Sequence, residues 1–154
     1  MAQSERRYHL SVTIRRLTTS DIPLAVAAAA RFKSSTISTG LAGRFLANPA
    51  NYLIVAQRQE DLVGFLVAYR LQRLDRAAEQ LFIYELEVVP SFRRRRVGTQ
   101  LIGYVRRLVQ EEALMEAFVL TDHNNEAAVG LYMRTGARRE GAAGVLFVYR
   151  GHAA

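Results

Sequence analysis

The chain has 154 residues, of which 50% are hydrophobic and 23% are charged, and it carries a formal net charge of +7. This composition is typical of one soluble globular domain that spans the whole chain, residues 1–154. No apolar run approaches the roughly 18 residues of a membrane span, so no membrane partner is expected. The absence of cysteine excludes disulfides, thiolate metal sites and a cysteine nucleophile.

The positive charge comes almost entirely from arginine, because Lys33 is the only lysine. Before residue 60 the only acidic residues are Glu5 and Asp21, whereas acidic residues crowd the middle of the chain. A basic surface attracts polyanions, which are here either nucleic acid or a cofactor with several phosphates. Residues 1–8 lack the apolar segment of a secretory signal, so we expect a cytoplasmic protein.

The first third of the chain predicts a strand followed by two helices. Residues 8–15 roughly alternate apolar and polar side chains, which favours a strand. Thr19 or Ser20 is the expected cap of an alanine-rich helix with a proline in its first turn. A short second helix over 41–47 is expected to end before Asn48 and Pro49.

The remainder predicts five strands and two helices in a mixed order. The strands are expected at 51–57, 62–71, 81–89, 117–121 and 145–150. Apolar residues return at helical spacing from Val97, and Asn125 opens another helix that Gly136 closes. The first two of these strands predict a hairpin. The fold class expected from this order is a single mixed α/β domain.

One stretch before a predicted helix suggests an anion site. The segment "SFRRRRVGTQLI" places four arginines between the strand that ends at Pro90 and the helix that starts near Val97. Backbone N–H groups at a helix start are unpaired, and a pyrophosphate binds there well when arginines flank it. Gly98 lets the backbone approach closely. A solvated basic turn is the other interpretation of the same residues.

This stretch resembles the acetyl-CoA signature of the GNAT N-acetyltransferase superfamily. In "LEVVPSFRRRRVGTQLI", Arg93 takes the first position of the motif and Gly98 the last. Arg96 stands where the family usually has a glycine, so its backbone is expected either to keep φ below zero or to accept strain. A second motif follows in "NNEAAVGLYMRTGA", which matches the family pattern at Asn125, Ala128, Leu131, Tyr132 and Gly136.

The resemblance implies a fold, a cofactor and a set of contacts to that cofactor. The fold is a mostly antiparallel twisted sheet, splayed between its fourth and fifth strands and flanked by helices. The cofactor is acetyl-CoA, released as CoA, and no metal is expected. The cofactor-binding residues that it implies are Leu86, Val88, Val89, Arg93, Arg94, Arg95, Arg96, Val97, Gly98, Thr99, Asn125 and Tyr132.

A narrower resemblance concerns the acceptor. Residues 68–88, "AYRLQRLDRAAEQLFIYELEV", resemble the aminoglycoside 3-N-acetyltransferases of the same superfamily. This implies an amine substrate such as an aminoglycoside, and a homodimer is one expected assembly. The implied substrate-binding residues are Tyr84, Glu85, Glu87, Asp122 and Glu126, which would make the acceptor pocket locally acidic. Acetylation of a protein N-terminus or a polyamine is an alternative, and a basic nucleic-acid-binding domain is the alternative without catalysis.

Acetyl transfer to an amine requires a proton acceptor and a proton donor. An aliphatic amine has a pKa of about 10.4, so a carboxylate or a water chain must take its proton. Glu85 is our first choice for the base, and Asp122 is the second. Tyr132 is the candidate general acid for the leaving thiolate, and the backbone N–H of Val88 is implied as donor to the carbonyl oxygen. Without a cysteine nucleophile, direct attack in a ternary complex is preferred.

Overall fold

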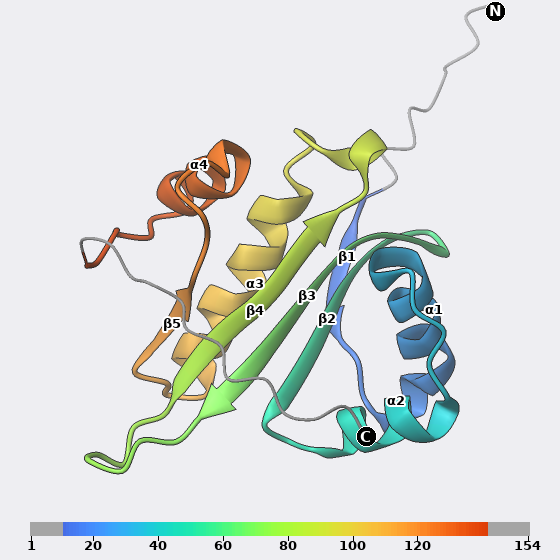
Figure 1. Ribbon diagram of the computed structural model, residues 1–154, viewed down its shortest axis with the longest axis horizontal. Helices are drawn as coiled ribbons and strands as arrows, with labels where there is room; N and C mark the ends of the chain where they lie inside the picture. Colours follow the sequence, from blue (N-terminus) through green and yellow to red (C-terminus); the bar gives the residue numbers. More distant parts are fainter. Residues whose placement is uncertain (1–10, 142–154) are drawn as a thin grey trace, which may run out of the picture.

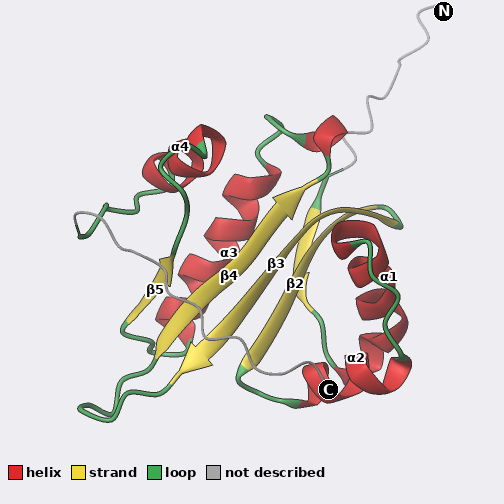
Figure 2. Ribbon diagram, viewed as in Figure 1, coloured by secondary structure: helices red, strands yellow, loops and turns green. Residues whose placement is uncertain are grey.

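The computed structural model describes residues 11–141. Within them the sheet has the order β1-β2-β3-β4-β5, and its strands pair antiparallel except for β4 and β5, which are parallel (Figures 1 and 2). The strands are β1 Thr13–Arg16, β2 Asn51–Arg58, β3 Asp61–Leu71, β4 Gln80–Val88 and β5 Glu116–Val119. The helices are α1 Ile22–Lys33, α2 Thr39–Ala47, α3 Val97–Glu111 and α4 Glu126–Arg134. The predicted mixed α/β class is confirmed.

Helices cover both faces of the sheet. On one face α3 packs its apolar side against alternate residues of the central strands, including Ile54 and Leu66, which are fully buried. On the other face α1 and α2 pack against the intervening residues, such as Val55 and Phe65. Because both faces are covered, β2 and β3 are continuous apolar runs rather than alternating ones.

Most of the elements expected from the sequence form, with shifted ends. The predicted hairpin is the pair β2 and β3, which Gln59 and Glu60 connect, with Gln59 in the left-handed region at φ 55°. Gly136, at φ 94°, follows the end of α4 as expected. β1 starts only at Thr13, and residues 8–10 of its predicted range lie outside the described residues. The predicted strand 145–150 lies outside them as well.

The predicted helix cap was wrong, because the N-cap residue of α1 is Asp21, whose side chain makes no capping hydrogen bond to that helix. Thr18, rather than Thr19 or Ser20, caps a short 3₁₀ helix that precedes α1. The Thr18 hydroxyl accepts from the N–H of Ser20 at 3.3 Å, and a carboxylate oxygen of Asp21 accepts from the N–H of Thr18 at 2.9 Å. This reciprocal pair requires an acidic residue three positions after the cap, and Asp21 satisfies that spacing only for Thr18.

The sheet divides between β4 and β5, as the resemblance implied. The two strands pair only from Gln80 opposite Glu116 to Ile83 opposite Val119, whereas β4 continues to Val88. Beyond this point β4 stays paired with β3, whereas the chain after β5 leads away to α4 (Figure 1). Within residues 11–141, no helix is both long and apolar enough to cross a membrane.

Two glycines give a paired test of how α3 packs on the sheet. A Cβ at Gly64 in β3 would lie 3.1 Å from a methyl of Val97 and 3.2 Å from the carbonyl oxygen of Glu87, whereas one at Gly103 in α3 meets nothing within 4 Å. Gly64→Ala should therefore lower the free energy of unfolding by about 1–3 kcal/mol. Gly103→Ala should raise it by about 0.5–1 kcal/mol, because alanine favours the helix. Denaturant unfolding checks both; equal effects would contradict the tight contact at Gly64.

Candidate functional site

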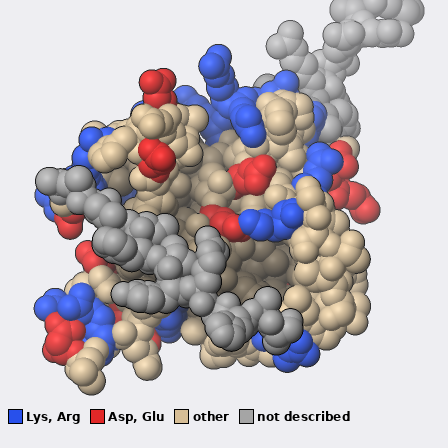
Figure 3. All heavy atoms as spheres, viewed as in Figure 1, with Lys and Arg blue, Asp and Glu red and all other residues tan. Residues whose placement is uncertain are grey.

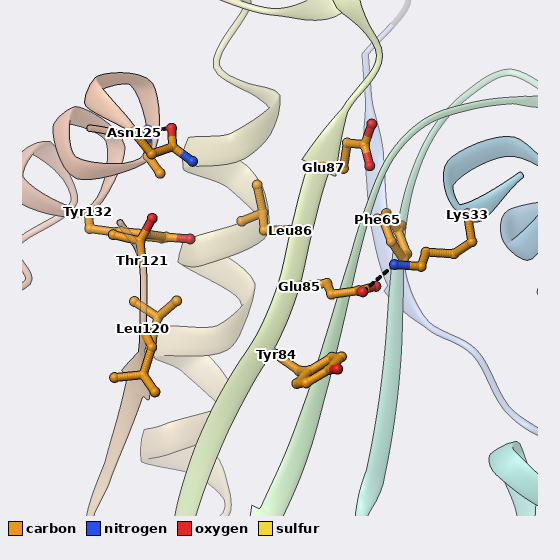
Figure 4. A pocket seen from close by; sticks show the side chains of 12 residues that line it. Lys33, Phe65, Tyr84, Glu85, Leu86, Glu87, Leu120, Thr121, Asn125 and Tyr132 are labelled. Atoms are coloured by element: carbon orange, nitrogen blue, oxygen red, sulfur yellow. Dashed lines mark hydrogen bonds and ion pairs between the residues drawn. The ribbon is translucent and has the colours of Figure 1, made fainter. Parts of the chain in front are cut away.

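A pocket of about 260 Å³ lies where β4 and β5 separate. One wall comes from β4, the end of α1 and the middle of β3, and the other comes from the end of β5, the chain after it and α4 (Figure 4). Among the predicted site residues, six line this pocket: Tyr84, Glu85, Leu86, Glu87, Asn125 and Tyr132. The fold therefore brings together residues of β4 and α4 that are about forty positions apart in the sequence.

A bulge in β4 determines which side chains face the pocket. Val67 of β3 lies opposite Glu85, but the next residue, Ala68, lies opposite Ile83, so Tyr84 is an extra residue without a partner in β3. Up to Ile83 the odd-numbered residues pack toward α3, and after the bulge Leu86 does so. Tyr84 and Glu85 consequently lie on the same face of the sheet, although they are adjacent in sequence.

Glu85 contacts a cation supplied by α1. The ammonium of Lys33, the last residue of α1, donates to a carboxylate oxygen of Glu85, as the dashed line in Figure 4 marks. The hydrogen bond to Glu85 is the main cause that raises the pKa of Lys33, and partial desolvation opposes it. Both side chains keep access to solvent, with exposed fractions of 47% for Lys33 and 26% for Glu85. Glu87 lies farther along the same strand and is exposed.

Tyr132 forms the facing wall. It lies in α4, is partly buried, and points toward the opening between the strands (Figure 4). Burial raises the pKa of its phenol above the usual value of 10.0. The side chain of Asn125, by contrast, has a structural role, because its oxygen accepts from the N–H of Ala128 at 3.1 Å and caps α4.

The four predicted carboxylates do not all line this pocket. Glu85 and Glu87 do, together with Lys33, whereas Asp122 and Glu126 are exposed and not part of the lining. A carboxylate oxygen of Asp122 accepts from the N–H of Asn124 at 3.0 Å and stabilises the turn before α4. Glu126 is in the first turn of α4, where its negative charge interacts favourably with the helix dipole.

The four arginines form an exposed basic loop at the start of α3. Arg96 is the N-cap residue, and its side chain makes no capping hydrogen bond to the helix. Its backbone has φ 63°, and that of Arg94 has φ 59°, so both accept the left-handed conformation that usually favours glycine. The sequence left two possibilities for Arg96, a backbone with φ below zero or a strained one, and the strained backbone is observed. Basic atoms gather over this loop at the top of the view, away from the acidic atoms in the hollow at the middle (Figure 3).

Contacts to neighbouring elements hold this arginine loop in place. The Arg93 side chain donates to the carbonyl oxygen of Val88 at 3.1 Å, and the Arg95 guanidinium lies 5.4 Å from the ring centre of Phe92. The side chains of Val89 and Val97 are buried, so these two predicted cofactor-binding residues can contact a ligand only through their backbone groups. A Cβ at Gly98 would lie 3.1 Å from a methyl of Leu131, which shows that this glycine also lets α4 approach α3.

Sequence reasoning missed several residues that line the pocket. These are Lys33, Phe65, Val119, Leu120, Thr121 and Ala128. For Lys33 a signal existed, because it is the only lysine in a chain rich in arginine. Its contact with Glu85 nevertheless joins residues 52 positions apart, which no local pattern predicts.

Residues 23–137 match the protein family described as "Acetyltransferase (GNAT) family". No curated protein matches the sequence. Solved structures that resemble this chain include an aminoglycoside acetyltransferase from an uncultured soil metagenomic sample in complex with sisomicin, with 22% identity and a TM-score of 0.77 over 90% of this chain and 97% of the other. The aminoglycoside acetyltransferase AAC(6′)-Iy in complex with a CoA bisubstrate analogue has 18% identity and a TM-score of 0.75, with coverages of 91% and 99%. A ribosomal-protein-alanine N-acetyltransferase from Brucella melitensis biovar Abortus 2308 has 18% identity and a TM-score of 0.70, with coverages of 90% and 100%.

The strained backbone at Arg96 can be tested against its neighbour. Arg96→Gly should raise the free energy of unfolding by about 0.5 kcal/mol, because relief of the left-handed strain exceeds the greater entropy of glycine in the unfolded chain. Arg95 is not among the residues with positive φ. Arg95→Gly should therefore lower the free energy of unfolding by about 0.5–1 kcal/mol. Opposite signs in denaturant unfolding support the strained conformation; a loss of stability in both variants contradicts it.

Proposed function

The chain belongs to the GNAT acetyltransferase family, and from this premise we propose that it transfers the acetyl group of acetyl-CoA to an amino group of an aminoglycoside. The observation that carries the proposal is one pocket with a carboxylate on one wall and a phenol on the other. Glu85 is the proposed base and Tyr132 the proposed acid, and both line that pocket. We further propose the 3-amino group as the acceptor.

The residues at the start of α3 fit the phosphates of acetyl-CoA. α3 has 15 residues and no side-chain cap, so its first N–H groups and its dipole are available to an anion. The exposed guanidinium groups of Arg94, Arg95 and Arg96 add charge-assisted hydrogen-bond donors. Acetyl-CoA supplies the activated acyl group as a thioester. The opening between β4 and β5 gives the acyl end a path toward Tyr132.

Glu85 is suited to accept the proton of a cationic amine. It already contacts an ammonium group, that of Lys33, so its carboxylate is placed to receive a protonated amine from the same side. A substrate amine that displaces Lys33 can lose a proton to Glu85 and then attack the acyl carbon directly. Asp122, our second choice, does not line the pocket and accepts a backbone hydrogen bond instead.

Tyr132 is suited to protonate the leaving sulfur. Because burial raises its pKa, the phenol stays protonated throughout the neutral range and can donate when the thiolate departs. The parent thiol has a pKa of about 8.5, so transfer from a phenol requires a short hydrogen bond in the transition state. A role in packing alone is the competing interpretation for this tyrosine.

The pocket also has the charge and surface that suit an aminoglycoside. Glu85 and Glu87 together outweigh the single charge of Lys33, so the pocket keeps a net negative charge in an otherwise basic chain. Tyr84 is 57% exposed at its edge and offers an aromatic surface to a sugar ring. The resemblance of residues 68–88 to the 3-N-acetyltransferases supports the 3-amino position, whereas the likeness to AAC(6′)-Iy makes the 6′-amino group the main competitor.

Substitution of each candidate base tests which carboxylate accepts the proton of the amine. Glu85→Gln should lower kcat/KM at neutral pH by roughly 100-fold and recover in part at alkaline pH, where more of the amine is already neutral. Asp122→Asn is the matched control and should stay within a few-fold of the parent protein. Steady-state rates across pH measure both. If Asp122→Asn changes the pH profile and Glu85→Gln leaves it intact, the base is Asp122.

A panel of amines tests the substrate. Gentamicin, spermidine and a peptide with an N-terminal alanine are each mixed with acetyl-CoA, and thiol release is followed. We expect kcat/KM for gentamicin to exceed the others at least about 10-fold, with KM rising as salt screens the carboxylates. NMR of the product should place the acetyl group on the 3-amino nitrogen. Turnover of the peptide or the polyamine but not of gentamicin contradicts the proposed aminoglycoside substrate. A product acetylated at the 6′-amino group contradicts the proposed 3-amino position.

A further inference from the structure

Lys33 contacts the carboxylate that, in the proposed function, accepts the proton of the substrate amine. Its Nζ contacts Glu85, and it lines the same pocket as Tyr132 (Figure 4). We propose that Lys33 is an acetylation site and that the chain acetylates this lysine itself when no other acceptor is present. This inference rests on the proposed function, because it uses the same carboxylate and the same acyl donor.

The position of Lys33 is defined by the fold. Lys33 is the last residue of α1, and the following residue, Ser34, ends the helix in the left-handed conformation at φ 48°. The neighbouring Phe32 stacks on Phe65 of β3, with 4.6 Å between ring centres and 10° between ring planes. Phe65 lies directly opposite Glu87 in the β3–β4 register. The stacked rings thus place the end of α1 beside the two carboxylates.

The composition of the chain makes Lys33 distinctive. Every other Lys or Arg position is an arginine, whose guanidinium stays protonated and does not act as an acyl acceptor under ordinary conditions. The only side-chain amine in 154 residues therefore lies against the carboxylate that we propose as the base. An arginine would form the same ion pair, so structural pairing alone does not require a lysine here.

The reaction at Lys33 balances without any further reactant. The ammonium loses one proton through Glu85 to solvent, and the free Nζ attacks the acyl carbon of acetyl-CoA. The C–N bond forms and the C–S bond breaks. Tyr132 gives its phenolic proton to the sulfur to release free CoA, and the second proton of the nitrogen passes through solvent to restore the phenol. Glu85 favours the charged form of Lys33, so we expect this acetylation to be slower than turnover of a free amine that enters the pocket.

Mass spectrometry of the full chain gives a direct test. The purified protein is incubated with acetyl-CoA alone, and the same protein unfolded in urea is incubated in parallel to measure uncatalysed acetylation. We expect the folded chain to gain one acetyl group on Lys33, mapped by peptide analysis, at least about 10-fold faster than the unfolded chain, because proximity acts only in the fold. Lys33→Arg, which keeps the ion pair, should abolish this gain, and Tyr132→Phe should slow it.

The outcomes separate this inference from the proposed function. An intramolecular reaction has a first-order rate that does not change when the protein is diluted in saturating acetyl-CoA. If the folded chain is acetylated at Lys33 no faster than the unfolded chain, yet turns over a free amine, the self-acetylation is overturned and the proposed function stands. If acetyl-CoA neither raises the Tm nor is consumed with any amine of the panel, the proposed function fails, and this inference fails with it.

Discussion

The early end of hydrogen bonding between β4 and β5 is the constraint on which the site depends. Four pairs of residues hold the strands together, from Gln80 opposite Glu116 to Ile83 opposite Val119. Beyond them β4 bulges at Tyr84, which turns Glu85 away from the α3 face, and the chain after β5 leads into α4 with Tyr132. A fully paired sheet would fill this space with backbone and leave no room for two opposed walls.

The arginine loop and the carboxylates of the pocket lie at different places on a molecule of high positive charge. The arginine loop extends from the start of α3, whereas the carboxylates lie on the strand that leads into it, and Figure 3 shows both on one face. Anionic groups and cationic groups of a ligand are thus attracted to different places. Arg93 connects the two regions, since it comes from the loop and donates to the carbonyl oxygen of Val88.

The features that could be predicted from the sequence are those whose interacting residues lie close together along the chain. The helix from Val97 and the closing Gly136 depend on a few adjacent residues, and both were found. The cap ahead of the first helix was misplaced, because Thr18 caps a short 3₁₀ helix through its three-residue spacing to Asp21 and α1 begins only after Asp21. The bulge at Tyr84 arises from register with another strand, and the contact of Lys33 with Glu85 arises from packing of α1, so neither leaves a local pattern.

The solitary lysine has a practical consequence for anyone who handles the protein. Amine-reactive dyes, cross-linkers and coupling resins react with lysine side chains and the α-amino group, and Lys33 is the only such side chain in the sequence. A label or a surface attached through it would therefore sit in the pocket beside Glu85. Since the chain has no cysteine, a single introduced thiol on a distant exposed position offers a selective attachment point that leaves this pocket open.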